Sequence, residues 1–236
     1  MANLRCLEFI SKQEADFAMI RYFFTSLISA LLLFTTAHCG GIQKVAITGG
    51  LSCGNSTVCQ IFQDLGLETV SADLIVHDLL NNAPRTYRAV VDLLGEAIVV
   101  DGHLDKSLIG AIVFSSPKDL QALEKILYPL VHESIEKAYQ KASRDPSINL
   151  FVAEAPLLFE GGTEALYEKI IAVVADEEYT RERFIHKTGK DKNEYERRMS
   201  MQLSPEEKAS RANFVIINNG NLKDLQKQVE ETMNSI

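Results

Sequence analysis

The stretch from Val45 to Val58, VAITGGLSCGNSTV, restricts the fold more than any other segment. A short apolar run ends in two glycines, and apolar residues at helical spacing follow from Val58 onward. This order predicts a buried strand, a tight turn and then a helix. Gly49 and Gly54 are separated by four residues, as in the phosphate-loop pattern G-x-x-x-x-G-K-[ST]. The segment therefore predicts a strand–loop–helix unit that binds phosphate groups.

In such a loop the backbone N–H groups point at phosphate oxygens, and the following helix adds its positive dipole end. We expect nucleotide contacts from Gly49, Gly50, Leu51, Ser52, Cys53, Gly54, Asn55, Ser56 and Thr57. Ser56 would hold Mg²⁺. Asn55 occupies the place of the lysine that bridges the β- and γ-phosphates. Taken alone, the segment also fits a plain strand-to-helix turn that uses glycine for its tight geometry.

The rest of the chain alternates between apolar runs typical of buried strands and apolar residues at helical spacing. Apolar runs predict strands at 67–70, 150–153, 169–175 and 214–217. Helical spacing predicts helices at 56–65, 74–80, 87–94, 104–113, 120–142 and 222–233, and a charged helical region from 180, with an interruption at Pro129. Alternation over about 190 residues predicts an α/β fold with a parallel sheet covered on both faces.

Composition excludes several classes of protein. The net charge is −8 over 236 residues, so the chain offers no bulk basic face for nucleic acid. The four cysteines, Cys6, Cys39, Cys53 and Cys59, match no zinc spacing, and we interpret them as reduced thiols of a cytoplasmic protein. Small anionic ligands stay compatible with this charge, because a local loop binds phosphate inside an acidic protein.

The N-terminal residues differ from the rest. Residues 22–43 contain no charged side chain, and the centre from Leu27 to Phe34 is strongly apolar. Three interpretations stay open: a signal peptide, a membrane anchor, or an extension from a misassigned start. We expect residues 1–43 to be separate from a domain at 44–236, and any membrane contact to be confined to 22–43.

Several later segments, together with the loop, carry a resemblance to a known family. They are VSADLIVHDLL, LLGEAIVVDGHLDKSLIGAIVF, LEKILYPLV, EAPLLFE, RFIHKTG and RRMSMQLSPEEKASRANFVIINNG. In this order they resemble the motifs of dephospho-CoA kinases, of the P-loop nucleoside-monophosphate-kinase-like group, from Lys44 to about Val229. The resemblance implies a three-layer P-loop kinase fold with a helical CoA-binding subdomain and a short lid. It also implies ATP-dependent phosphorylation of the ribose 3′-hydroxyl of dephospho-CoA, with Mg²⁺, by a monomer or weak oligomer.

The same resemblance implies roles for particular residues. Asp73 would be the catalytic base, although an Asp before Leu74 is also a common helix N-cap. Arg183 would be a catalytic cation of the lid and Lys187 an ATP contact; four residues apart, they share one helical face. The alternative for these two cations is a solvated helix paired to nearby acids.

Other implied roles concern metal and substrate. Glu154 would hold Mg²⁺ through water, or else would be a solvated strand end. His77 and Glu160 would bind substrate, with a lone exposed histidine as the alternative for His77. Asn218 would lie by the adenine of ATP.

Departures from the family pattern raise a second functional hypothesis. They are Asn55 for Lys, Ser71 for Asp, Lys106 for Arg, Tyr128 for His, Glu154 for Asp, Lys187 for Arg and Asn213 for Asp. Asn55 is the important one, because loss of a preorganised cation costs about 10²- to 10³-fold in rate. The alternative function is therefore a catalytically impaired relative that binds nucleotide or CoA as a regulator or scaffold. A kinase with another acceptor is disfavoured by EAPLLFE and LEKILYPLV.

Overall fold

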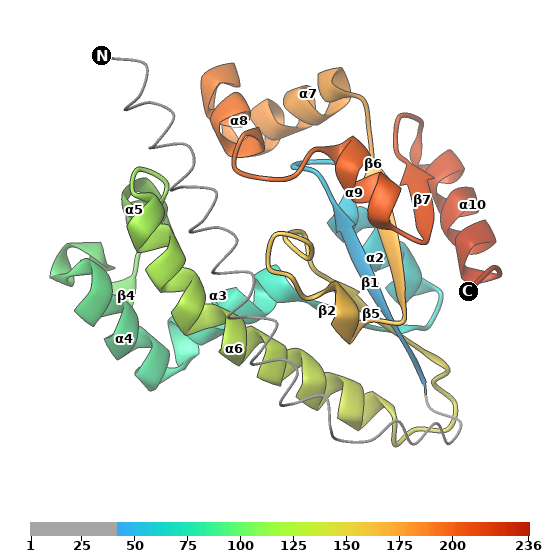
Figure 1. The fold of residues 1–236 in the computed structure, drawn as a ribbon, viewed down its shortest axis with the longest axis horizontal. Coiled ribbons are helices and arrows are strands. Elements are labelled where there is room, and N and C mark those ends of the chain that lie inside the picture. Colours follow the sequence, from blue (N-terminus) through green and yellow to red (C-terminus); the bar gives the residue numbers. More distant parts are fainter. Residues whose placement is uncertain (1–41) are drawn as a thin grey trace, which may run out of the picture. The chain divides into compact units, whose positions relative to one another are not determined.

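The computed structural model describes residues 42–236 and builds them around one parallel sheet (Figure 1). Its five strands stand in the order β2-β5-β1-β6-β7. Their bounds are β1 Gln43–Gly49, β2 Glu68–Ser71, β5 Leu150–Glu154, β6 Lys169–Val174 and β7 Phe214–Ile217. All four pairings are parallel. The α/β fold expected from the alternation is confirmed, with β1 at the centre.

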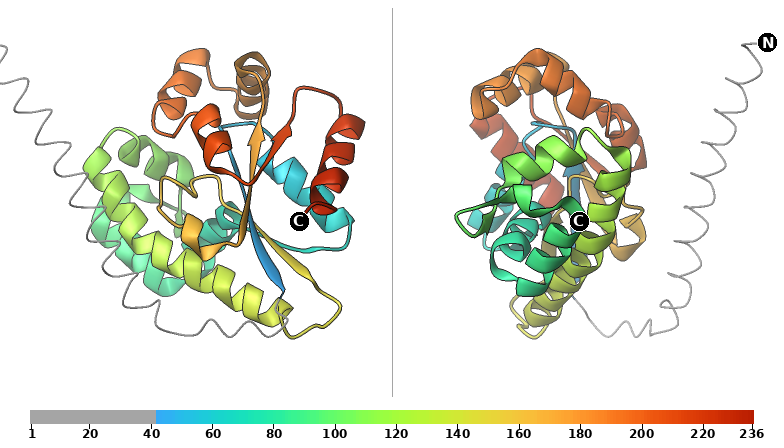
Figure 2. Two further views of the ribbon diagram at one scale, coloured as in Figure 1. Left: turned by 45° about the vertical axis from the view of Figure 1, so that its right-hand side comes forward. Right: turned by 90° about the vertical axis from the view of Figure 1, so that its left-hand side faces the viewer.

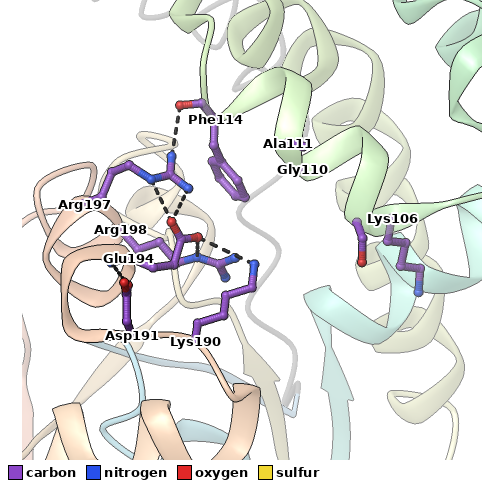
Figure 3. Close-up of a pocket in the computed structure, with 10 residues that line it drawn as sticks. Lys106, Gly110, Ala111, Phe114, Lys190, Asp191, Glu194, Arg197 and Arg198 are labelled. Atoms are coloured by element: carbon purple, nitrogen blue, oxygen red, sulfur yellow. Dashed lines mark hydrogen bonds and ion pairs between the residues drawn. The ribbon is translucent and has the colours of Figure 1, made fainter.

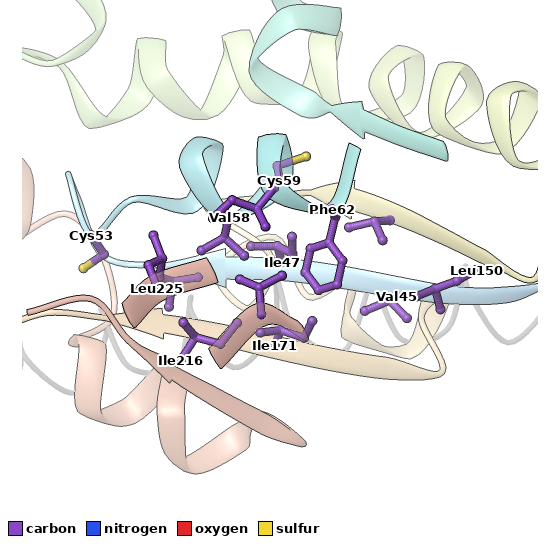
Figure 4. Packing of buried hydrophobic residues seen from close by; sticks show 14 residues of the cluster. Val45, Ile47, Cys53, Val58, Cys59, Phe62, Leu150, Ile171, Ile216 and Leu225 are labelled. Atoms are coloured by element: carbon purple, nitrogen blue, oxygen red, sulfur yellow. The ribbon is translucent and has the colours of Figure 1, made fainter. Parts of the chain in front are cut away.

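Helices cover both faces of the sheet. On one face, α2 (Asn55–Asp64) and α10 (Leu222–Met233) bury Val58, Phe62 and Leu225 against the side chains of β1, β6 and β7 (Figure 4). On the other face, α6 (Pro117–Ala142) and the segment after β5 pack on Ala46, Phe151 and Ile170. Alternate residues of β1 thus enter opposite cores, as the period of a strand requires.

A helical subdomain lies beside the sheet and has its own core. Its elements are α3 (Ala72–Asn82), α4 (Pro84–Leu94), the short helix η1 (Glu96–Ile98), the hairpin β3–β4 (Val99–Val100 and His103–Leu104), α5 (Lys106–Val113) and the first half of α6. Buried Val90, Ile98, Ile109 and Leu123 join these elements. The helices agree with the sequence prediction, whereas the β3–β4 hairpin, two residues per strand, is too short to produce a period.

Two helices after β6, α7 (Glu177–Thr188) and α8 (Lys192–Met199), lie at the same end of the sheet as the loop that follows β1 (Figures 1 and 2). The next helix, α9 (Pro205–Arg211), packs along β6 and leads back to the start of β7, and a short helix η2 (Glu164–Leu166) precedes β6. Asp191 and Ser204 cap α8 and α9 by accepting a backbone N–H. α7 and α8 occupy the sequence segment expected to form a lid.

Pro129 does not interrupt its helix, which corrects the expectation. α6 runs without a break through 26 residues. A proline removes the N–H donor of its own position and crowds the carbonyl four residues earlier, but buried Leu127 and Val131 on either side anchor the helix in the subdomain and the main core. Within residues 42–236, no helix is long and apolar enough to span a bilayer. The signal- or anchor-like segment at 22–41 lies outside the described residues.

The β7 edge of the sheet is closed by a side chain from α10. Gln228 donates its amide N–H to the Ile217 carbonyl (2.8 Å) and accepts the Ile217 N–H on its Oε1 (3.0 Å). The side-chain amide therefore occupies both backbone hydrogen-bonding groups of the last residue of the edge strand.

The first strand begins slightly earlier than expected. Gln43 pairs with Leu150, and Ile42 is buried in the second core, where its carbonyl accepts the Tyr139 hydroxyl (3.0 Å). We therefore place the start of the independently folding part at Ile42 rather than Lys44.

This start point is testable by truncation. A protein of residues 42–236 should keep the melting temperature of the full chain, because every described core residue is present. Removal of Ile42 and Gln43 as well should cost about 2–4 kcal/mol, as loss of a buried isoleucine does, and lower the melting temperature by several degrees in calorimetry. Equal stability of proteins starting at 42 and 44 would contradict this assignment. A large loss on removal of residues 1–41 alone would place that segment in the core.

Candidate active site

The candidate site is the loop between β1 and α2, at the carboxyl end of the central strand. Gly49 has no room for a side chain, since a Cβ there would overlap the Asn55 Oδ1 and the Val173 carbonyl oxygen. Gly54 has φ 104°, a left-handed conformation, and a Cβ there would overlap the Asn218 amide. Both glycines are thus required by geometry, and the loop ends at the N-terminus of α2, where free backbone N–H groups favour anions.

Asn55 is the first residue of α2 and is buried, with 8% of its surface exposed. Its Oδ1 is buried and has no hydrogen-bond partner within the described residues. An asparagine here contributes a neutral carboxamide to the loop and no cation. The positive charge that a phosphate loop requires must therefore come from elsewhere in the site.

The acidic side of the site is formed by Ser56 and Glu154. The Ser56 hydroxyl donates to Glu154 Oε1 (2.6 Å), and Glu154 ends β5 with only 4% of its surface exposed. The interpretation of Glu154 as a solvated strand end is therefore wrong: the residue is buried beside the loop.

Asp73 lies on α3, directly after β2, at the same edge of the sheet. The helix begins at Ala72 and Ser71 is its N-cap residue, so the N-cap interpretation of Asp73 is wrong. Surrounding protein atoms and the negative charge of Glu154 raise the pKa of the Asp73 carboxyl, and the positive charge of Lys187 lowers it. The side chain itself is exposed to solvent, which suits a group that meets a substrate.

This donor set fits Mg²⁺. Hydroxyl and carboxylate oxygens are the ligands that Mg²⁺ takes, with phosphates and water completing its octahedron. No cluster of three His, Cys, Asp or Glu side chains forms a metal cage anywhere in residues 42–236. Ser56 and Glu154 would therefore hold the ion together with nucleotide phosphates.

The basic side of the site comes from α7. Arg183 donates from Nη2 to the Asn218 carbonyl (2.9 Å), and its Nη1 is buried without a partner in the described part of the chain. Lys187 is exposed one helical turn further on. Neither side chain forms an ion pair with an acid among residues 42–236, where the ion pairs of this region involve Arg181 and Lys190 instead. The structure therefore does not show these two cations paired to nearby acids.

Asn218 links the loop to the lid. Its Nδ2 donates to the Cys53 carbonyl (2.8 Å) and its own carbonyl accepts from Arg183. The residue is buried, and its amide fills the space that Gly54 leaves open. Asn218 therefore braces the phosphate loop, and its proposed contact with adenine is not needed to explain its position.

The residues expected to bind the acceptor lie in different surroundings. His77 is exposed on α3 and contacts Asn81. Glu160 is directed into the protein: its Oε1 accepts from the Leu203 N–H and from Lys208 Nζ (both 2.9 Å), and its Oε2 is buried without a partner within residues 42–236.

A cleft of about 620 Å³ opens between α5 and the α7–α8 segment (Figure 3). Its polar lining is mainly cationic: Lys106, Lys190, Arg197 and Arg198, with Glu194 and Asp191. Arg197 donates to the Phe114 carbonyl (3.0 Å), which joins the two walls. Contacts with Arg198 and Arg197 lower the pKa of Glu194 to about 2, so this carboxylate stays charged. Of these residues only Lys106 is marked in the sequence, as a departure from the family pattern, because the other side chains form ordinary helical charge patterns.

The two cysteines of the described region lie in the core beside the loop and α2. Cys53 and Cys59 are buried free thiols. Burial raises the pKa of both, that of Cys59 to about 11 with a further contribution from Glu154. Such thiols stay protonated and unreactive, and Cys6 and Cys39 lie outside the described residues.

The central loop, the parallel sheet and the buried acid beside Ser56 define a P-loop kinase. A shikimate kinase from Acinetobacter baumannii shares the fold, with a TM-score of 0.50 at 13% identity, over 82% of this chain and 94% of that one. The chain belongs to the dephospho-CoA kinase family, whose model matches residues 43–224.

Individual relatives agree with this assignment. The chain is 46% identical over 191 residues to a dephospho-CoA kinase of Protochlamydia amoebophila, covering 80% of this chain and 94% of that protein. It is 36% identical to a dephospho-CoA kinase of Aquifex aeolicus, with 80% and 95% covered. A solved dephospho-CoA kinase from Campylobacter jejuni superposes with a TM-score of 0.59 at 25% identity, over 81% of this chain and 96% of that one.

Restoring the loop cation should raise activity. Asn55→Lys places an ammonium where the β- and γ-phosphates would lie, so turnover should rise by about one to three powers of ten. Steady-state kinetics of the two proteins test this. Asn55→Met is the matched control, because it lengthens the side chain without charge and should give no gain. An unchanged rate for a folded Asn55→Lys protein would mean that another cation already acts there.

Proposed function

We propose that this protein transfers the γ-phosphoryl group of ATP to the ribose 3′-hydroxyl of dephospho-CoA, giving ADP and CoA, the last step of CoA synthesis. Membership of the dephospho-CoA kinase family supports the substrates. The observation that carries the chemistry is the position of Ser56, Glu154 and Asp73 together beside the loop. The new bond joins the 3′-oxygen to phosphorus, the bond to the β-phosphate oxygen breaks, and the hydroxyl proton leaves to a base.

ATP would bind with its phosphates on the backbone N–H groups of residues 49–57 and at the start of α2. Mg²⁺, when bound by Ser56 and through water by Glu154, would neutralise charge on the β- and γ-phosphates. Arg183 offers a buried Nη1 beside this loop that has no partner among residues 42–236, and Lys187 lies on the same face of α7. These two cations would supply the positive charge that Asn55 lacks.

Asp73 would accept the 3′-hydroxyl proton. A base works best when its pKa is close to the operating pH, and the protein atoms packed around this solvent-accessible carboxyl, together with Glu154, move the pKa of Asp73 in that direction. Lys187 acts on the same carboxyl from the lid. The charges of Glu154 on the acidic side of the site and of Lys187 on the basic side therefore both act on the pKa of Asp73.

We place the acceptor in the cleft between α5 and α8. Dephospho-CoA carries a diphosphate, and the cationic lining of this cleft suits such a group. The cleft joins the helical subdomain to the lid, so an acceptor there would bring both walls together. His77, exposed on α3, would contact the acceptor away from its diphosphate, whereas Glu160, expected to bind substrate, is paired with Lys208 and is not placed at the acceptor.

A catalytically impaired relative remains the rival because of Asn55, but no comparison supports a loss of function. ATP-dependent CoA formation by the purified protein separates the two, and a folded protein that binds ATP and CoA without turnover would favour the rival. We propose a cytoplasmic reaction, where ATP is supplied, and a monomer or weak oligomer.

The base is tested by Asp73→Asn. The amide keeps the shape and loses the basicity, so CoA formation should fall by about 10²-fold or more while the Kd of ATP stays unchanged. Turnover assays and calorimetry measure the two quantities. Asp78→Asn, an exposed change on the same helix, is the control and should leave turnover unchanged. Full activity of Asp73→Asn would place the base elsewhere.

The pH dependence of kcat/KM tests whether Asp73 is the titrating base and whether Lys187 lowers its pKa. The base acts only when charged, so kcat/KM should fall as pH falls through the Asp73 pKa, which lies above the ordinary 3.8. Lys187→Met removes a charge that lowers this pKa, so its acid limb should lie at higher pH than that of the wild type. A limb that does not move would show that the titrating group is not Asp73.

The acceptor cleft is tested by Lys106→Met/Lys190→Met. Loss of both cations should raise KM for dephospho-CoA by about tenfold and leave KM for ATP within about twofold. Lys223→Met/Lys227→Met, on exposed positions of α10, removes the same charge elsewhere. An equal effect of both double variants would mean that only net charge matters.

A further inference from the structure

Lys208, on α9, is a fully buried lysine with 0% of its surface exposed. Its ammonium donates to the Gly49 carbonyl (3.2 Å) and the Pro156 carbonyl (2.7 Å), and pairs with Glu160 (2.9 Å). Three acceptors match the three donors of an ammonium, so the charge is fully satisfied without water. A buried charge is costly to keep in a protein interior, and its location is therefore informative.

The three acceptors belong to segments that build the active site. Gly49 ends β1 and begins the phosphate loop, and Pro156 follows Glu154 by two residues. The Pro156 carbonyl also accepts the Thr48 hydroxyl (3.0 Å). Lys208 thus ties the entry of the phosphate loop to the segment that carries the buried acid.

The same helix braces the next residue of the loop. A Cβ at Gly50 would lie 3.0 Å from the ring of Pro205, the first residue of α9. α9 therefore contacts both glycines of the loop entry, one through Pro205 and one through Lys208. Displacement of α9 would displace the loop.

Charge from Lys208 also reaches the middle of the loop. Burial raises the pKa of the Cys53 thiol, while the positive charges of Lys208 and Arg183 act in the opposite direction. Both cations thus act on the Cys53 thiol in the loop, although burial outweighs them and the Cys53 pKa is raised on balance.

We propose that Lys208 is a positioning residue for the phosphates of the nucleotide. Its ammonium holds the Gly49 and Pro156 carbonyls and so fixes the entry of a phosphate loop that has no lysine of its own. Because Lys208 is enclosed, it touches no substrate, and it acts through the loop on binding rather than on proton transfer. This inference rests on the proposed binding of ATP at the loop.

The chain contains a matched control for this test. Lys44, at the opposite end of β1, is also buried and pairs with Glu136 (2.9 Å). Lys208→Met/Glu160→Gln and Lys44→Met/Glu136→Gln make the same double change at the two ends of one strand. Both remove the charges and keep the shapes, which a buried pair often tolerates.

Calorimetry of purified proteins with ATP, ADP and AMP, without acceptor, measures the effect. Lys208→Met/Glu160→Gln should weaken the binding of ATP and of ADP by about tenfold. The binding of AMP should weaken by less than about twofold, because AMP lacks the β-phosphate that lies in the loop. The Lys44 pair variant should bind all three as the wild type does. In turnover assays KM for ATP should rise while kcat at saturating ATP stays within about threefold.

A folded Lys208 pair variant with wild-type ATP binding would overturn the inference. If that variant fails to fold, Glu160→Gln alone decides the question. This change leaves the ammonium and removes its counter-charge, so ATP binding should be equal or tighter, and a tenfold loss would overturn the inference. Failure of the wild-type protein itself to bind ATP would instead refute the proposed function.

Discussion

The close approach of three chain segments around Gly49 is the constraint on which the rest of the site depends. Only a residue without a side chain lets the Val173 carbonyl and Asn55 lie so near the end of β1. β6 can then pair along β1 as far as Gly49 itself. The loop, the start of α2 and the lid that follows β6 are consequently held at one end of the central strand.

Much of this arrangement follows from the sequence. β7 and α10 have the predicted bounds, and the other long elements differ by a few residues at their ends, because their periodicity spans whole elements. The glycine spacing predicts the phosphate loop, and the resemblance to dephospho-CoA kinases implies the role of Glu154; the binding roles of these residues stay predictions.

What the sequence could not reveal depends on contacts between distant residues. Lys208 appears in an ordinary acidic and basic run, SPEEKASR, and nothing in that run indicates that its side chain is enclosed. Glu160 was expected to face substrate, yet it faces Lys208. The implied contact of Asn218 with adenine stays a prediction, but the sequence does not reveal that its amide donates to the carbonyl of Cys53, 165 residues earlier in the chain. The β3–β4 hairpin is too short to leave a pattern.

The amide of Gln228 at the end of β7 has a consequence for behaviour at high concentration. An edge strand offers free backbone groups to any passing chain, and pairing of such edges starts aggregation. The exposed apolar side chains of Val215 and Ile217 would favour such pairing here. Gln228 occupies both the N–H and the carbonyl of Ile217. A second chain would therefore have to displace this amide before its backbone could pair at the end of β7.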